Sequence, residues 1–321
     1  MTVETALRWS HLRTDDVGAW HELMNHLAKV DDTGEVFTPE ILTEELGEPG
    51  FTPETDSWTI WDGDRLVAYG IVSVSMTPDH EGRVRCHVGM GGVHQDWRGR
   101  GIGRELMGRM EERATALARE RHPGTAAYLR ASGGVEGAQV RRLLVHRGYA
   151  VVRYFNDLTR PLPGEPLPDV AVDGYSIVSE TDDLEEATLL AHNAAFADHW
   201  GATDITAEQW AHYWRSTSGR PDLSSLAVDD EGGRVLAYVL ASQFVPGELY
   251  VTIVGTRPEA RGRGLAAACL ARTLQRAIGT GEYATARLDV DSASPTGATR
   301  LYERLGFRTV RTFASMQRDV D

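Results

Sequence analysis

Apolar and polar residues follow two alternating periods along this chain. Short runs with strand-like alternation, such as RLVAYG at 65–70, stand beside stretches with apolar residues at helical spacing, such as 264–278, which ends at GTGE. In each half the pattern predicts two helices, hairpin strands, a longer strand, a Gly-rich turn, a long helix, a strand, a helix and closing strands. A strand–helix–strand passage inside a mainly antiparallel sheet is typical of the α+β (mixed α/β) class.

The order of elements repeats because the sequence repeats. LRTDDV matches SETDDL, RLVAYG matches RVLAYV, one Arg-Gly-Arg-Gly loop matches another, and LLVHRGYAVVRYF matches LYERLGFRTVRTF. The paired segments start 167, 169, 163 and 158 positions apart, as a few loop insertions and deletions would produce. Four ordered matches indicate a tandem duplication.

The two copies are separated by RPLPGEPLPDVAVDG at 160–174, whose four prolines cannot continue a helix or a sheet. We therefore expect two domains, each a twisted, mixed, mainly antiparallel sheet flanked by helices. The expected ranges are an N-terminal domain at 1–160, a Pro-rich linker at 161–173 and a C-terminal domain at 174–321.

Each copy places a Gly-rich turn directly between a strand and a helix. The turns read RGRGIG at 98–103 and RGRGLA at 261–266. Such a turn directs unpaired backbone N–H groups and the positive end of the helix dipole toward one point, which favours a phosphate or pyrophosphate. The loop arginines can add charge-assisted hydrogen bonds. The P-loop and dinucleotide-binding patterns are both absent from these two turns.

These turns resemble the acyl-CoA pyrophosphate loop of the GNAT N-acetyltransferase superfamily, and LYERLGF at 301–307 is similar to its second signature. The tandem arrangement and the segment HNAAFADHW resemble the actinobacterial two-domain members of the mycothiol synthase type. The resemblance implies that acetyl-CoA lies between two parallel strands that splay apart, and that no metal takes part. The residues expected at the cofactor are Val254, Thr256, Arg261, Gly262, Arg263, Gly264, Leu265 and Ala266, with Val93, Arg98, Gly99, Arg100, Gly101, Ile102 and Gly103 in the first copy.

The resemblance also suggests which copy is catalytic. Tyr302 matches the family's tyrosine, whose hydroxyl can protonate the leaving thiolate, whereas the first copy has Leu144 there. We therefore expect catalysis in the C-terminal domain, with the N-terminal domain degenerate. The alternative for Tyr302 is a core aromatic with a hydrogen-bonded hydroxyl. Ser294 stands where many members carry Asn, and the first copy replaces that segment with ASGGVEG at 131–137.

The general base is predicted from strand geometry. Glu248 and Tyr250 are two positions apart and therefore share one face of their strand. A carboxylate there can accept the proton of an attacking ammonium, although Glu248 follows Pro-Gly and would equally suit a solvated hairpin. Arg85 and His87 align with this pair in the first copy, where an exposed or satisfied strand histidine is the simpler interpretation.

Acceptor choice is expected from 196–214, which combines tryptophan and tyrosine with acidic residues and histidine. An aromatic, acidic pocket suits the protonated amine of a small molecule, including a cationic one. The other interpretation is an amphipathic helix with Trp210 and Trp214 in the core. The segment departs from the mycothiol synthase pattern after HNAAFA, so we do not expect that particular acceptor. The candidate substrate residues are Asp198, His199 and Trp200.

Composition narrows the functional class further. A net charge of −14 and a pI near 5.3 argue against a nucleic-acid binder, and the sequence shows neither a membrane span nor a signal peptide. Cys86 and Cys269 are expected to be buried thiols. We expect a cytoplasmic N-acetyltransferase, monomeric or homodimeric, that acts on a small-molecule amine. Protein lysine or N-terminal acetylation, and CoA binding without turnover, are the alternatives.

Overall fold

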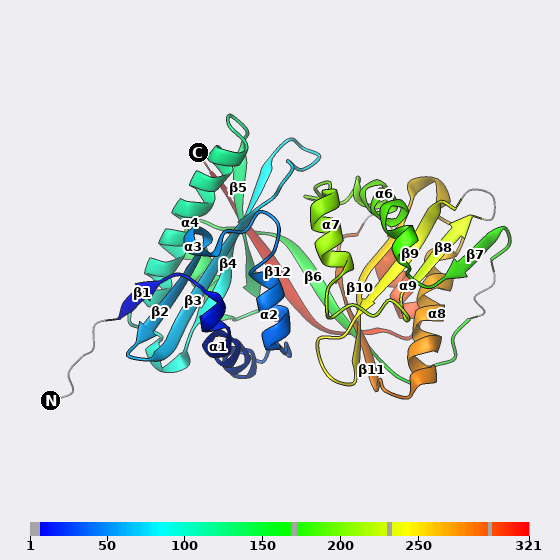
Figure 1. Ribbon diagram of the computed structural model, residues 1–321, viewed down its shortest axis with the longest axis horizontal. Helices are drawn as coiled ribbons and strands as arrows, with labels where there is room; N and C mark the ends of the chain where they lie inside the picture. The colour runs from blue at the N-terminus through cyan, green and yellow to red at the C-terminus, as the bar shows by residue number, and fades with distance from the viewer. Residues whose placement is uncertain (1–6, 169–171, 230–232, 295–296, 321) are drawn as a thin grey trace. The chain divides into compact units, whose positions relative to one another are not determined.

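The computed structural model describes residues 7–168, 172–229, 233–294 and 297–320. Contacts divide these residues into two compact units, which Figure 1 draws with the labels used below. The N-terminal unit comprises the described parts of Met1–Val152 and Ala314–Asp321, and the C-terminal unit those of Arg153–Phe313. Each unit has a sheet with helices on both faces, as the pattern of the sequence predicts.

The sheet of the N-terminal unit has the strand order β1-β2-β3-β4-β5-β12. Only β4 and β5 are parallel, because the long helix α4 crosses over between them. The elements are β1 (Arg8–Ser10), α1 (Val17–Val30), α2 (Pro39–Glu45), α3 (Pro53–Asp56), β2 (Ser57–Asp62), β3 (Arg65–Val74), β4 (Val84–Val93), α4 (Ile102–Arg121), β5 (Ala127–Gly134), α5 (Gln139–His146) and the end of β12 (Arg308–Val320), with 3-10 turns η1 (Thr14–Asp16) and η2 (Gln95–Trp97).

The C-terminal unit repeats this arrangement with the strand order β6-β11-β10-β9-β8-β7. Here β10 and β11 are the parallel pair, and α8 crosses between them. The elements are β6 (Ala150–Pro161, from residue 153), β7 (Tyr175–Val178), α6 (Glu185–Phe196), α7 (Ala207–Trp214), β8 (Ser225–Asp229), β9 (Val235–Ser242), β10 (Glu248–Thr256), α8 (Leu265–Thr280), β11 (Thr285–Asp291) and α9 (Ala298–Arg304), with η3 (Asp182–Leu184) and η4 (Pro258–Ala260).

The two halves of the sequence exchange their closing strands. Strand β6 ends the first half, yet its residues 155–161 pair with β11 of the C-terminal unit. Strand β12 ends the second half, and its residues 314–320 pair with β5 of the N-terminal unit. The compact units therefore differ from the expected ranges 1–160 and 174–321 at these two strands. The domain boundaries expected from the duplicated sequence remain a prediction.

One arginine on each exchanged strand anchors the helix that precedes the closing strand of the other half. Arg160 of β6 is fully buried and donates from Nε to the Leu305 carbonyl, 2.6 Å away and directly after α9. Arg318 of β12 donates from Nη1 to the Arg147 carbonyl, 2.8 Å away and directly after α5. Capping the last carbonyls of a helix with a cation is favourable. The exchanged strands thus help to fix the positions of the C-terminal ends of α9 and α5.

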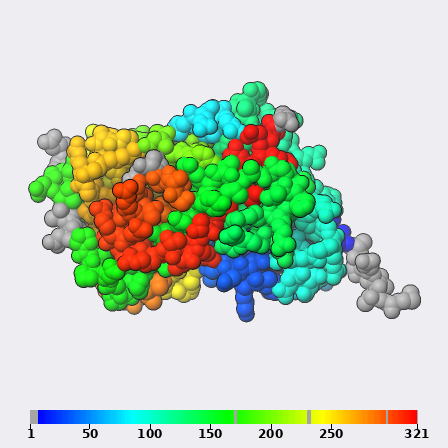
Figure 2. All heavy atoms as spheres, turned by 180° about the vertical axis from the view of Figure 1, so that it is seen from behind, coloured from blue at the N-terminus to red at the C-terminus, as the bar shows by residue number. Residues whose placement is uncertain are grey.

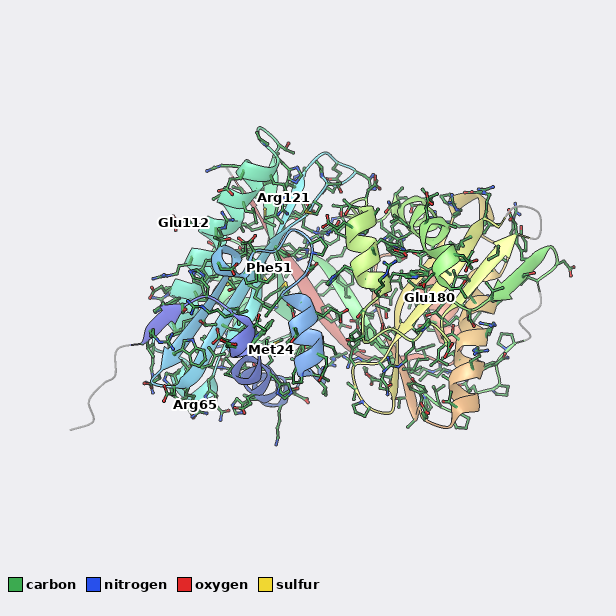
Figure 3. All side chains as sticks on the ribbon, viewed as in Figure 1. Met24, Phe51, Arg65, Glu112, Arg121 and Glu180 are labelled. Carbon is green, nitrogen blue, oxygen red and sulfur yellow. The ribbon has the colours of Figure 1, made fainter. Side chains whose placement is uncertain are left out.

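Both faces of each sheet are covered by apolar side chains. In the N-terminal unit α4 and α5 pack on one face, while Met24 of α1 and Phe51 belong to the cluster on the other face (Figure 3). In the C-terminal unit α8 and α9 pack on one face, and α6 with α7 on the other. Cys86 and Cys269 are buried in these cores as predicted, and burial raises the pKa of both thiols to about 12.

The first part of the expected linker packs against the C-terminal unit. Leu162 belongs to its core, and its N–H donates to the Ala284 carbonyl at 2.7 Å. Residues 169–171 of the linker lie outside the described residues. Among the helices described, none is both long and apolar enough to cross a membrane.

A buried carboxylate holds the exchanged end of the chain in the N-terminal unit. Glu111 accepts hydrogen bonds from Arg147 at 2.8 and 2.6 Å and from Arg318 of β12 at 2.9 Å. Burial by itself would raise the pKa of Glu111, but these two arginines lower it overall. The charge of Glu111 therefore stabilises the folded unit.

We expect Glu111→Gln to lower the free energy of unfolding by roughly 2 to 3 kcal/mol, because it leaves two partly buried arginines without their counter-charge. Urea denaturation followed by circular dichroism measures this loss. The control is Glu105→Gln, which removes an exposed pair with Arg109 and should cost less than about 0.5 kcal/mol. Equal losses in the two variants would contradict the assignment.

Candidate active site

The strand β10 leads through η4 into a glycine loop and then into α8. Gly262 and Gly264 have φ angles of +77° and +82°, in the left-handed region that favours glycine. A Cβ atom built on either would meet nothing within 4 Å, so the backbone conformation and not space requires glycine. The first-turn amides of a 16-residue helix have no partner four residues earlier and face the same point as the helix dipole.

The loop of the N-terminal unit has the same backbone conformation. Gly99 and Gly101 have φ angles of +78° and +89°, and Cβ atoms there would also meet nothing within 4 Å. Each loop follows a 3-10 turn and precedes a helix whose N-cap glycine is left-handed. The two Gly-rich turns that match in sequence therefore have the same backbone structure.

The arginine side chains of both loops contact protein groups. Arg261 forms a bidentate ion pair with Asp198, at 2.5 and 2.9 Å, and Arg98 forms one with Asp31, at 2.8 and 2.6 Å. Arg263 donates to the hydroxyl of Tyr175 at 2.5 Å. Arg100 donates to the Asp96 carbonyl at 2.9 Å. Phosphate contacts by these side chains remain a prediction, and the backbone amides are the groups that the loop presents.

The strands β10 and β11 separate beside the loop. Their pairing runs from Glu248 opposite Thr285 to Tyr250 opposite Arg287, although β10 continues to Thr256. On its other side, β10 carries a bulge between Val251 and Ile253. The last residues of β10 therefore have ladder partners on the β9 side and an open edge toward β11. An extended chain with amide groups can hydrogen-bond to such an edge.

Tyr302 lies on α9, buried in the core of the C-terminal unit, and Leu144 lies at the corresponding place on α5 of the N-terminal unit. The Phe307 N–H donates to the Tyr302 carbonyl at 3.0 Å, as the Tyr149 N–H donates to the Leu144 carbonyl at 3.0 Å. Burial raises the pKa of Tyr302, so its phenol stays protonated at neutral pH. Seen from behind, the segments near residues 260 and 300, gold and orange-red, occupy the same face of this unit (Figure 2).

Glu248 and Tyr250 lie on one face of β10, opposite the face that α8 covers. Burial raises the pKa of Glu248, an effect that Arg287 partly offsets. The nearest guanidinium nitrogen of Arg287 is 4.0 Å from Oε1 of Glu248, because Arg287 instead makes a bidentate pair with the buried Asp157 at 2.8 and 2.7 Å. Glu248 is thus a weakly paired carboxylate with a raised proton affinity.

A second carboxylate on this face was not predicted. The hydroxyl of Tyr250 donates to Oδ2 of Asp289 on β11 at 2.9 Å. Burial raises the pKa of Asp289 as well. Asp289 alternates with apolar neighbours in RLDVD, so the period of that strand could have placed it on the open face. Glu248 and Asp289 thus add two carboxylates to a face that also carries the Arg287–Asp157 pair.

The predicted acceptor residues follow α6, and each of them contacts a different side chain. Asp198 binds Arg261, the ring of His199 lies 4.6 Å from that of Phe196, and the guanidinium of Arg153 lies 5.3 Å from the Trp200 ring. Trp210 and Trp214 are buried in the core between α6, α7 and the sheet. The core interpretation of these two tryptophans is confirmed.

Asn193, which belongs to the HNAAF motif, fixes the segment that follows α6. Its Nδ2 donates to the Ile205 carbonyl at 3.1 Å, and its Oδ1 accepts from the Ile205 N–H at 3.0 Å. Asn25 makes the same pair of bonds with Phe37 in the N-terminal unit, at 2.9 and 3.0 Å. Both residues of the C-terminal pair lie 168 positions after those of the N-terminal pair, an offset that agrees with the duplication.

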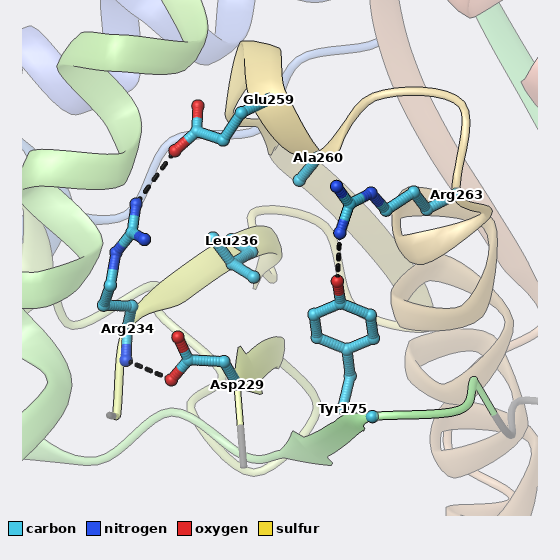
Figure 4. Close-up of a pocket in the computed structure, with 8 residues that line it drawn as sticks. Tyr175, Asp229, Arg234, Leu236, Glu259, Ala260 and Arg263 are labelled. Carbon is cyan, nitrogen blue, oxygen red and sulfur yellow. Dashed lines mark hydrogen bonds and ion pairs between the residues drawn. The ribbon is translucent and has the colours of Figure 1, made fainter. Parts of the chain in front are cut away.

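A pocket of about 420 Å³ lies where residues of β7, β8 and β9 meet η4 and the glycine loop (Figure 4). The ion pair of Arg234 with Glu259, 2.9 Å long, crosses one side, and the contact of Arg263 with Tyr175 crosses the other. This pocket is separate from the opening between β10 and β11. It is lined by Gly174, Tyr175, Asp229, Arg234, Leu236, Glu259, Ala260 and Arg263.

The corresponding face of the N-terminal unit is basic. Arg85 and His87 take the positions of Glu248 and Tyr250, and His87 lies opposite Arg130 on β5. Burial, followed by the charges of Arg85 and Arg130, lowers the pKa of His87 to about 3. A histidine that stays neutral beside two arginines cannot attract an ammonium group. Within the described ranges, no group of three or more histidine, cysteine or acidic residues could hold a metal ion.

Comparison with known proteins gives consistent matches. The model of the acetyltransferase (GNAT) family matches residues 20–127 and 188–307. The mycothiol acetyltransferase of Mycobacterium sp. (strain JLS) is 32% identical over 226 residues, covering 67% of this chain and 69% of that protein.

Solved structures share the fold over both units. A GCN5-related N-acetyltransferase from Sphaerobacter thermophilus has a TM-score of 0.71 at 22% identity, covering 98% of this chain and 95% of that one. A tandem GNAT protein from the clavulanic acid biosynthesis pathway has a TM-score of 0.71 at 18% identity, covering 98% of each chain. The tandem architecture is thus shared with structures of low sequence identity.

Proposed function

Because this chain belongs to the GNAT acetyltransferase family, we propose that its C-terminal unit transfers the acetyl group of acetyl-CoA to a primary amine of a small molecule. The observation that carries the proposal is the separation of β10 from β11 beside the glycine loop at 261–266. The open edge suits the amide-containing arm of the donor, and the loop amides suit its pyrophosphate. Val254 and Thr256 lie on that edge.

In the proposed transfer, Glu248 and Tyr302 carry out the two proton transfers. The amine nitrogen attacks the thioester carbonyl carbon, and the carbon–sulfur bond breaks. Glu248 takes the proton that the nitrogen loses, directly or through water, and Tyr302 gives its phenolic proton to the departing sulfur. The rest of the contribution is orientation and placement of charge.

The acidic face of this unit favours an amine acceptor. Arg287 and Arg311 both pair with Asp157, with an Nε–Oδ2 distance of 2.5 Å in the second pair, so these three groups together keep one positive charge. Glu248 and Asp289 remain as carboxylates with raised pKa values near the opening. An arriving ammonium group is attracted by these carboxylates and passes its proton to one of them. Asp198, His199 and Trp200 are the proposed acceptor-side residues.

The donor site can be assigned to one unit by a matched pair of substitutions. We expect Gly264→Glu to weaken CoA binding at least tenfold, because it strains the loop and brings a carboxylate to the diphosphate. Gly101→Glu meets the same left-handed φ and the same open space, so it controls for backbone strain. Isothermal calorimetry with CoA and thiol release from acetyl-CoA are the measurements. Turnover lost only in Gly101→Glu would reverse the assignment.

Tyr302→Phe should lower kcat about a hundredfold and leave the Kd for CoA within about twofold, because only the transferable proton is removed. Tyr283→Phe is the control, since Tyr283 is a buried tyrosine in the same core. Thiol release is measured with a panel of amino sugars, amino acids, polyamines and short peptides as acceptors. Unchanged turnover in Tyr302→Phe would exclude this residue as the acid.

The pH dependence tests Glu248. A base must be unprotonated, so kcat/KM should rise with pH through the pKa of Glu248, at a higher pH than for an ordinary glutamate because burial raises that pKa. Profiles between about pH 5 and pH 9 with amines of different basicity separate this limb from deprotonation of the amine itself. Glu248→Gln should abolish the limb that is common to all amines. Its persistence in that variant would assign the base elsewhere.

A further inference from the structure

One guanidinium joins the donor loop to the end of helix α6. Arg261, the first residue of the loop, makes the two bonds to Asp198 described above, and its Nη2 also donates to the Ala195 carbonyl at 2.9 Å. The hydrogen bonds from Arg261 lower the pKa of the Asp198 carboxyl, so the pair is charged on both sides at neutral pH. The partners are 63 and 66 residues apart in the chain. The contact is therefore tertiary and not part of the loop itself.

The same contact exists in the other unit. Arg98 is the first residue of the N-terminal loop, and its partner Asp31 directly follows α1. There the third bond of the arginine goes from Nε to the Val93 carbonyl, 2.9 Å away, instead of to a helix carbonyl. The arginine–aspartate pair thus occurs at equivalent positions of both units and is a shared feature of the duplicated fold. Of the two loop arginines, therefore, only Arg261 also hydrogen-bonds to a carbonyl of the helix that precedes its aspartate.

The segment between α6 and α7 is held at both ends. Asn193 binds both backbone groups of Ile205 at one end, and Asp198 binds the donor loop at the other. The intervening residues include His199 and Trp200. Helix α6 has a further link to β10, because His192 Nδ1 lies 2.7 Å from the Tyr238 hydroxyl, and a Cβ on Gly255 would lie 2.4 Å from the Tyr238 ring. Acceptor-side and donor-side elements are thus connected twice.

We infer that the Arg261–Asp198 pair couples donor binding to the order of the acceptor segment, residues 197–205, so that Asp198 acts as a positioning residue. The inference rests on the proposed function, because it assigns acetyl-CoA to the loop that Arg261 begins. A diphosphate seated on the amides of 262–266 fixes the backbone that carries Arg261, and the bidentate pair fixes Asp198 in turn. By linkage, an ordered acceptor segment strengthens donor binding by the same factor.

The inference predicts an unexpected sign for the effect of removing the Asp198 charge on CoA affinity. If Arg261 only attracted phosphate, removing the opposing carboxylate in Asp198→Asn would free its positive charge and tighten CoA binding. If Asp198 only contacted the acceptor, CoA binding would not change. Positioning predicts the opposite sign, a weakening of CoA binding of about threefold to tenfold, because the ordered state is no longer supported.

Hydrogen–deuterium exchange with CoA as the probe tests the coupling without an acceptor. In the unaltered full-length chain, CoA should slow exchange in peptides that cover 261–268 and also in those that cover 197–205. In Asp198→Asn the slowing should persist at 261–268 and disappear at 197–205. Calorimetry on the same samples measures the change in Kd. Asp31→Asn is the matched control, since it breaks the equivalent pair and should leave both effects in the C-terminal unit intact.

The double variant Asp198→Asn/Arg261→Gln checks that the two residues act through one another. Its loss of slowing at 197–205 should equal that of Asp198→Asn alone. Slowing at 261–268 without slowing at 197–205 in the unaltered chain would overturn the inference and leave the proposed function intact. The same holds if Asp198→Asn keeps the slowing or binds CoA more tightly. No binding of CoA by the unaltered chain would overturn the proposed function itself.

Discussion

The separation of two parallel strands is the constraint on which the rest of this structure depends. Once β10 and β11 stop pairing after Tyr250 and Arg287, the end of β10 has hydrogen-bonding groups with no ladder partner on one side. Exposed strand edges are normally covered or paired. A ligand with its own amides can satisfy this edge, and the glycine loop that follows supplies a place for its charged end. Strand, loop and helix thus form one continuous binding surface.

The exchange of closing strands explains how this opening is supported. Each unit takes its last strand from the other half, and an arginine of that strand, Arg160 in one unit and Arg318 in the other, donates to the carbonyl that follows a helix. In the C-terminal unit that helix carries Tyr302. In the N-terminal unit Arg318 of the incoming strand β12 pairs with Glu111, and in the C-terminal unit Asp157 of the incoming strand β6 pairs with Arg311. The position of a proposed catalytic side chain therefore depends on residues from both halves.

The duplicated units have kept their backbone and diverged in charge. Both glycine loops contain two left-handed glycines, and in both the first arginine pairs with an aspartate. In both units an asparagine of the helix before that aspartate binds the backbone of a residue 12 positions later. The sheet face beside the opening is basic in the N-terminal unit and acidic in the C-terminal unit. The arginines of the C-terminal face pair with Asp157 and leave two further carboxylates, Glu248 and Asp289, on that face, whereas Arg85 and Arg130 stand beside a neutral histidine. The two units thus share the backbone geometry of the loop and differ in the charge of the neighbouring sheet face.

Local features were determined by the sequence alone. Periodicity predicted the strand and helix order, the glycines predicted the two turns between strand and helix, and the alignment of Tyr302 with Leu144 distinguished the units. The spacing of Glu248 and Tyr250 put them on one strand face. These properties follow from the backbone preferences and side-chain directions of neighbouring residues. The domain boundaries were less predictable: β6 and β12 have the same pattern, so either strand could complete either sheet.

Partnerships between distant segments were decided by the tertiary structure. The arginines of the loops were expected to reach phosphate, yet Arg261 binds Asp198 and Arg263 binds Tyr175. The contact of Tyr250 with Asp289 joins two strands, and the clamp of Asn193 on Ile205 closes a loop. A charged or amide side chain can bind any of several groups of suitable chemistry. Which one it binds depends on what the folded chain brings within about 3 Å, and sequence spacing does not encode that distance.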